Sequence, residues 1–208
     1  MPTYPLAFPS VSVVDSTFGI VSSSASSRSP FTYTEQIQQN AGMRFEGTVK
    51  FRLTKTTDAG ILKAFLAELQ GRYGTFLYGD PDYLAKGPQG ALGGTPLVNG
   101  GSQTGNTLNI DGCSNSITGW AKRGDYIQLG TGTAARLHMI TQDADSNGSG
   151  QVALKIMPAL RSSPSDNAAV TVTGAKGLFR MASNRADWSG NKSSIHDVDF
   201  SFVEAISE

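Results

Sequence analysis

The stretch TQDADSNGSG (residues 141–150) is the segment whose residue types and spacing come nearest to a metal site. Three oxygen-bearing side chains and a glycine occupy the first, third, fifth and sixth places of a calcium-binding EF-hand loop: Asp143, Asp145, Asn147 and Gly148. The twelfth place, where such a loop needs a bidentate glutamate, holds Leu154 inside a strand pattern. We therefore interpret the stretch as a hairpin turn, in which Gly148 and Gly150 take positive φ and Asn and Asp tolerate it.

The two histidines and the remaining carboxylates form no catalytic group along the chain. His138 and His196 are far apart in sequence and lack a zinc-ligand spacing, so we expect each to be partly buried or to lie at an interface. Asp197 and Asp199 fall on one face of a strand, where a solvated acidic face is more common than a carboxylate pair. GDPD (residues 79–82) precedes no phosphate-binding helix start, and no G-x-S-x-G is present.

Four aromatic residues raise the possibility of a sugar-stacking platform: Tyr83, Trp120, Tyr126 and Trp188. The simpler interpretation, which we prefer, is that these rings fill a small barrel and cover a sheet edge. Four basic residues are scattered among glycines and apolar residues and predict no nucleic-acid stripe: Arg123, Arg136, Lys155 and Arg161. Cys113 has no histidine partner motif and is expected to be a small buried residue beside a turn. We assign no catalytic, cofactor-binding or metal-ligating residue, and no cofactor.

Composition limits the classes of function further. Of the 208 residues, 16% are charged, and the formal net charge is +0, which provides no strong field for binding nucleic acid or anionic lipid. A single cysteine excludes an internal disulfide and a cysteine-based zinc site. No apolar run reaches the length of a membrane span, and MPTYPLAFPS lacks the features of a secretion signal. We expect synthesis in the cytoplasm and no membrane insertion.

The N-terminal part of the chain predicts strands followed by a helix. SSSASSRSP (Ser22–Pro30) is of low complexity, and we expect a mobile loop there. Met43–Leu53 alternates, with five residues on the inner face: Phe45, Gly47, Val49, Phe51 and Leu53. The period then changes to that of a helix, whose apolar face is Ile61, Leu62, Phe65, Leu66 and Leu69. Thr56 or Thr57 is expected to cap its start, Asp58 suits the positive end of its dipole, and Gly71 closes it.

The remainder of the chain predicts short strands with many turns, in line with its 24 glycines. A short strand, Thr75–Tyr78, precedes a Gly/Pro-rich stretch, and five short strands between glycine-rich turns then predict a small barrel. Two longer strands after Gly174 are expected to return to the N-terminal sheet. The predicted fold is mainly β: a discontinuous β-sandwich with one α-helix (residues 1–87 and 175–208) that carries an inserted small β-barrel (residues 88–174).

Several quoted segments together resemble one family. They are the helix leading into LQGRYGTFLYGDP, the strand GDYIQLG, the hairpin DSNGSG leading to IMPALR, and the terminal FSFVEAI. In this order and over nearly the whole chain they are similar to distal tail proteins, a family of tail proteins of long-tailed bacteriophages and prophages. Phe45 stands where that family often has tryptophan.

The resemblance implies a structural virion protein, not an enzyme, at the distal end of the tail. Distal tail proteins form a ring, usually hexameric, that joins the tail tube to the baseplate hub or tail tip. The implied partners are further copies of the chain, the tail tube protein, the hub and other tail-tip proteins. Two alternatives remain open at this point: a receptor- or carbohydrate-binding tail-tip protein that uses the barrel aromatics, and a tail-associated hydrolase, for which the sequence offers no nucleophile or acid.

Overall fold

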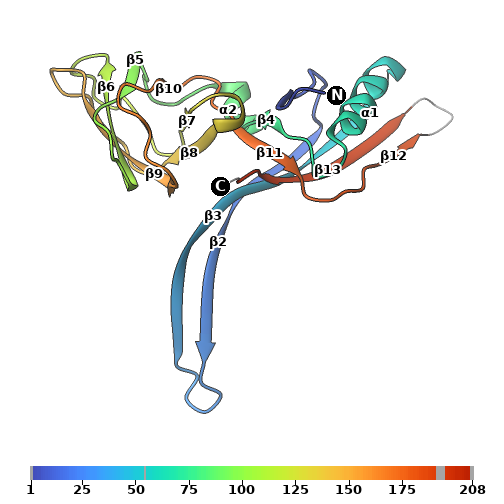
Figure 1. Cartoon of the computed structure of the whole chain (residues 1–208), viewed down its shortest axis with the longest axis horizontal. Helices are drawn as coiled ribbons and strands as arrows, with labels where there is room; N and C mark the ends of the chain where they lie inside the picture. Colours follow the sequence, from blue (N-terminus) through green and yellow to red (C-terminus); the bar gives the residue numbers. More distant parts are fainter. Residues whose placement is uncertain (1, 54, 191–194, 207–208) are drawn as a thin grey trace.

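A computed structural model of the chain describes residues 2–53, 55–190 and 195–206. Met1 and residues 207–208, the two ends of the predicted sandwich, lie outside the described residues. The body consists of a curled sheet covered by a helix and, beside it, a second, barrel-like sheet, while a long hairpin projects away from both (Figure 1). The predicted class, mainly β with one principal helix, is confirmed.

The first sheet has seven strands in the order β1-β4-β11-β13-β3-β2, with β12 paired to β13. β1 and β4 are parallel, and the other pairs are antiparallel. The last strands pair with the early ones, because β13 lies against β3 from His196–Leu53 to Val203–Glu46, so the predicted return to the N-terminal sheet is confirmed. The strand bounds are β1 Leu6–Ala7, β2 Asp15–Arg28, β3 Glu35–Leu53, β4 Phe76–Tyr78, β11 Gly177–Met181, β12 Asp187–Gly190 and β13 His196–Glu204.

Helix α1 (Thr56–Leu69) covers one face of this sheet. Its buried face is that predicted from the sequence with one exchange: Ala59 is buried, whereas Ile61 is 55% exposed. The predicted threonine cap is wrong, because the helix begins one residue earlier than such a cap allows and Lys55 occupies the N-cap position without a side-chain hydrogen bond. Asp58 does lie in the first turn, and Gln70 and Gly71 both adopt positive φ at the end.

The second sheet has six strands in the order β10-β7-β8-β9-β6-β5. A bridge between Leu97 and Ala169 brings β5 to the start of β10, and the sheet is therefore nearly closed, as the predicted small barrel requires. A short helix, α2 (Pro81–Lys86), precedes it; Asp80 caps α2 by accepting from the backbone N–H of Asp82 at 2.9 Å. The strand bounds are β5 Gly94–Val98, β6 Gly105–Cys113, β7 Tyr126–Leu129, β8 Arg136–Ile140, β9 Val152–Leu160 and β10 Val170–Thr171, with a 3-10 turn at Gly132–Ala134.

Each sheet has its own apolar core. The first core is rich in phenylalanine, with Phe45, Phe76 and Phe179 fully buried, and the second is built from aliphatic residues around Trp120. The burial pattern of β3 confirms its predicted inner face, and buried and exposed residues alternate along β13 in the same way. Tyr126 and Leu137 of the barrel-like sheet belong to the first core, so the two sheets pack against each other.

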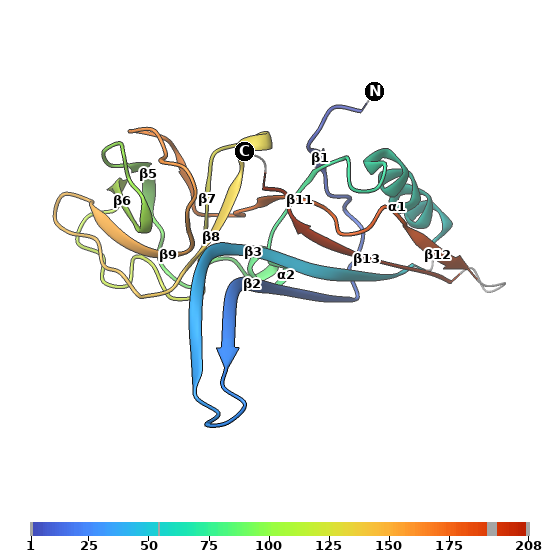
Figure 2. The same ribbon diagram turned by 60° about the horizontal axis from the view of Figure 1, so that its bottom comes forward.

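The predicted loop at Ser22–Pro30 is wrong over most of its length, and only Ser29 and Pro30 lie outside strand β2. Residues as far as Arg28 continue strand β2, which pairs with β3 from Ser24–Gln39 to Arg28–Glu35 beyond an irregularity at Ser23. Every residue from Ser22 to Gly42 is exposed except Ser29, which is half-buried. This part of the β2–β3 hairpin projects away from the body (Figure 2). We call Ser22–Gly42 the arm.

Candidate functional site

The stretch that came nearest to a metal site serves as a structural connection between β8 and β9. Asp145 accepts from the backbone N–H of Gly119 at 2.6 Å, and Asn147 Oδ1 accepts from the backbone N–H of Gln151 at 2.9 Å. Asp143 accepts from the backbone N–H of Arg123, and that hydrogen bond, with the Lys122 ammonium, lowers its pKa to about 2. Among the described residues no three His, Cys, Asp or Glu side chains gather where they could hold a metal ion.

The expected turn geometry is correct in part. Gly150 takes positive φ (69°), where its missing Cβ lets the Cys113 carbonyl oxygen approach, but Gly148 does not have positive φ. Asn147 stabilises the turn through its side chain, because its Oδ1 also accepts from the backbone N–H of Ser149 at 2.9 Å.

The two histidines lie in different sheets. His138 on β8 is only 3% exposed, and its Nδ1 lies 2.7 Å from the Pro158 carbonyl oxygen, so Nδ1 carries the proton and donates. Burial lowers the pKa of His138, which keeps the ring neutral at pH 7. His196 on β13 is half-buried, as expected, and pairs with Leu53 in the ladder. The structure does not bring the two together.

The four aromatic residues do not form a platform. Trp120 is fully buried and donates to the Gly93 carbonyl oxygen at 2.8 Å, whereas Trp188 is 50% exposed on edge strand β12 beneath the Lys63 ammonium. Tyr83 and Tyr126 are buried, with ring centroids 5.2 Å apart at the junction of the two sheets. Burial raises the pKa of Tyr83 to about 12. Of the four, Trp120 fills the barrel core as expected, whereas Tyr83 and Tyr126 belong to the core of the first sheet.

The carboxylate pair and the single cysteine also occupy positions that favour a structural role. Asp197 and Asp199 lie on the exposed face of β13, and Asp197 accepts from Arg52 Nε at 3.0 Å. Cys113 is buried beside a turn, as predicted, and burial raises the pKa of its thiol to about 12, so that it is not a nucleophile at neutral pH.

The arm exposes three large apolar side chains. Two of them are aromatic and lie at the tip: Phe31 is 92% exposed and Tyr33 68% exposed. The third, Ile37, lies on β3 and is 66% exposed. An isolated two-stranded hairpin is at best marginally stable in water, and its edges offer unpaired backbone groups. A projecting, apolar-tipped hairpin is therefore a surface suited to contact with another protein chain.

An ion pair between a partly exposed arginine and a buried glutamate fixes the base of the arm to the rest of the molecule. Arg161, which follows β9, binds Glu204 of β13 through both nitrogens of its guanidinium fork, at 2.5 and 2.8 Å. The same side chain donates to the Met43 carbonyl oxygen at 2.6 Å, and Glu204 also accepts from the backbone N–H of Phe45 at 3.2 Å. We call these four residues the base junction. It joins the barrel-like sheet, the last strand and the inner strand of the arm.

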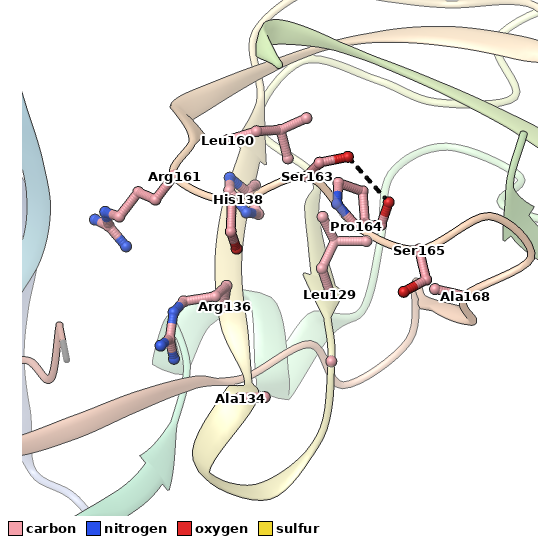
Figure 3. A pocket seen from close by; sticks show the side chains of 12 residues that line it. Leu129, Ala134, Arg136, His138, Leu160, Arg161, Ser163, Pro164, Ser165 and Ala168 are labelled. Atoms are coloured by element: carbon pink, nitrogen blue, oxygen red, sulfur yellow. Dashed lines mark hydrogen bonds between the residues drawn. The ribbon is translucent and has the colours of Figure 1, made fainter. Parts of the chain in front are cut away.

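A pocket of about 270 Å³ lies next to the base junction, between the β7–β8 turn and the segment after β9 (Figure 3). Its apolar lining includes Leu129, Leu160 and Ala168, and His138 closes its inner end. Figure 3 shows Arg136 and Arg161 on one side of the pocket, and Pro164, Ser165 and Ala168 on the other. Serines 162, 163 and 165 are exposed, so the pocket opens to solvent at that rim.

The sequence alone did not reveal the arm or the base junction. β2 buries no face in the arm, so it has no apolar alternation by which to recognise a strand. The available signal was the Ser-Pro turn at residues 29–30 between two polar, β-tolerant runs of similar length. In the sequence Arg161 is one of several scattered basic residues, and no local pattern distinguishes Glu204.

Comparison with known proteins adds one match. Residues 85–174 match the family model described as distal tail protein pb9, B domain, which is a phage tail family. The matched segment contains all six strands of the barrel-like sheet, and over it the resemblance to distal tail proteins is confirmed. No curated protein matches the sequence. Neither helix in the described part of the chain has the length and apolar composition needed to cross a bilayer.

Proposed function

We propose that this chain is a structural protein of a bacteriophage tail, a distal tail protein whose copies form a closed ring at the distal end. The ring, which we take to be hexameric, connects the tail tube to the baseplate hub or tail tip. The match of residues 85–174 to a distal tail protein domain supports the tail role. The observation that carries ring formation is the arm, which exposes apolar residues away from the body.

The arm lacks buried side chains that would stabilise it within its own chain. Ordering a residue costs about 1–2 kcal/mol of backbone entropy, and core packing normally offsets that cost. From Ser22 to Gly42 no side chain is buried and only Ser29 is half-buried, so the arm gains little of this packing within its own chain. Contact with a second chain supplies the missing burial and pairs the free strand edges. A contact of this obligate kind buries well over about 2,000 Å².

The proposed partners follow from a ring at the end of a tube: further copies of the chain, the tail tube protein on one face, and the hub and other tail-tip proteins on the other. The protein acts in the virion and is not an enzyme. The carbohydrate-binding alternative receives less support, because three of the four aromatic residues that motivated it are buried.

The experiment shortens the arm. Ser22 and Met43 pair across the hairpin, so a two-residue Asn-Gly turn between them replaces residues 23–42 without changing the register of the sheet. We expect the natural chain to sediment as a ring-sized oligomer with a central hole in negative stain, and the shortened chain to be a folded monomer with nearly unchanged Tm. Immunogold against the protein should label the distal end of the tail.

Two results would contradict the proposal. If the natural chain stays monomeric at high concentration, and the immunogold label lies on the capsid or neck, then both ring formation and the distal position are contradicted. A shortened chain that still assembles into rings removes the arm as the main subunit contact. Circular dichroism of both chains provides the control for folding.

A further inference from the structure

The tip of the arm is an ordered turn that presents an aromatic ring to solvent. The backbone N–H groups of Phe31 and Thr32 both donate to Ser29 Oγ at 3.3 Å, and Tyr33 N–H donates to the Ser29 carbonyl oxygen at 3.0 Å. The Arg28 guanidinium lies 4.8 Å from the centre of the Tyr33 ring. Phe31 remains 92% exposed on this turn, so its burial against another surface would be favourable.

The pocket beside the base junction has the size and chemistry to receive such a ring. Its volume of about 270 Å³ exceeds the roughly 150 Å³ of an apolar cavity that holds benzene. Leu129, Leu160 and Ala168 give this pocket apolar side chains against which a ring can pack.

The charges of the two surfaces are also complementary. At the pocket, Arg136 donates to the carbonyl oxygens of Thr133 and Ala135, and no ion pair of Arg136 exists within the described ranges 2–53, 55–190 and 195–206. At the tip, Glu35 is exposed and likewise has no ion pair within those ranges. Arg28 is the cross-strand neighbour of Glu35, but its guanidinium lies over the Tyr33 ring and forms no ion pair with Glu35 within those ranges. The Glu35 carboxylate can therefore match the Arg136 guanidinium beside the apolar cavity.

We propose that the arm tip of one copy docks into this pocket of the next copy, with Phe31 in the cavity and Glu35 facing Arg136. The proposal rests on the ring proposed above and names its contact surfaces. The occupant is a second copy because the tip projects away from its own body in both views (Figures 1 and 2). The arm tip and the pocket lie on different surfaces of one chain, so the contact between two copies is head-to-tail. Such contacts close into a ring when the rotation from one copy to the next divides a full turn evenly.

Paired cysteines test the contact in the full-length chain. Phe31→Cys is combined with Ala134→Cys, since Ala134 is an exposed residue of the pocket lining, and the assembled protein is oxidised with copper phenanthroline. We expect a ladder of disulfide-linked oligomers on a non-reducing gel. The matched control combines Phe31→Cys with Ile61→Cys on the exposed face of α1 and should give no ladder. The natural Cys113 is buried and common to both variants.

A charge exchange provides a second readout that does not depend on cysteine geometry. Glu35→Arg or Arg136→Glu alone should weaken subunit association about tenfold or more, and the two together should restore it. Rings that form normally with neither the 31–134 cross-link nor rescue by the exchange overturn this inference and leave the proposed function standing. A natural chain that forms no ring overturns both.

Discussion

At the scale of single residues, the base junction is the arrangement with the most consequence for the proposed assembly. The Glu204 side chain is 1% exposed and that of Arg161 is 26% exposed, so the carboxylate depends on the guanidinium for its charge compensation. The Arg161 guanidinium also holds the Met43 carbonyl oxygen, at the point where β3 leaves the body. Arg161 therefore links the base of the arm to the segment that lines the pocket of the same chain. In the proposed ring, that pocket receives the arm of a neighbouring copy.

Replacement of this arginine should be costly. Arg161→Ala leaves the buried Glu204 carboxylate without its partner, and we expect the free energy of unfolding to fall by about 3 kcal/mol. The matched control is Arg52→Ala, which breaks an ion pair with Asp197 whose side chains are 68% and 52% exposed; its effect should stay within about 0.5 kcal/mol. Urea unfolding of both variants measures the difference, and equal losses would contradict the role given to the base junction.

At the scale of elements, Gly47 shows why the centre of the curled sheet accepts so little change. A Cβ at this position of β3 would lie 2.1 Å from the Thr17 carbonyl oxygen of β2 and 2.8 Å from Cζ of Phe202 on β13. The absence of a side chain lets three strands approach one another where β2 and β3 continue toward the arm. Gly60, within helix α1, has nothing within 4 Å of the same position.

The two glycines give opposite predictions for one chemical change. Gly47→Ala should lower the free energy of unfolding by more than about 2 kcal/mol, because backbone and not only side-chain atoms must move. Gly60→Ala should raise it by about 0.5–1 kcal/mol, because alanine favours the helix and meets no neighbour. Thermal and urea unfolding compare the two, and a tolerated Gly47→Ala would show that the strands are less closely packed than described.

At the scale of the whole molecule, stability is distributed unevenly. The two apolar cores join through Tyr126 and Leu137 into one body, whereas the arm has only its own ladder of hydrogen bonds. Regions with few buried contacts unfold locally at a low free-energy cost, and a partner that binds their folded form suppresses this local unfolding. Assembly should therefore change the arm far more than the body.

Hydrogen exchange tests this expectation. In the dilute monomer the ladder amides of residues 24–39 should exchange rapidly, and in the assembled form they should be protected at least about 100-fold, because docking suppresses opening. The ladder amides of Phe51 and Phe200, in the pairing of β3 with β13, serve as the internal control and should be slow in both states. An arm that exchanges equally fast before and after assembly would contradict its role in the contact.

The sequence by itself determined the elements that bury one face. The alternation of Met43–Leu53 and of β13, the apolar face of α1, and the glycine-bracketed strands of the barrel-like sheet all express the separation of apolar from polar side chains. Repeated burial leaves a period that can be recognised without coordinates. The division at residues 88 and 174 into two domains stays a prediction.

Only the tertiary structure decided the parts whose partners are distant in sequence or that bury no face within their own chain. Arg161 and Glu204 are separated by 43 residues, and nothing local marks them as a pair. The arm buries nothing within its own chain, so it leaves no apolar period, and its serines suggested a loop. Ile61, placed on the buried face of the helix by its spacing, is exposed because Ala59 packs instead. A pattern reports burial along one segment, whereas contacts between segments depend on how the chain is folded in space.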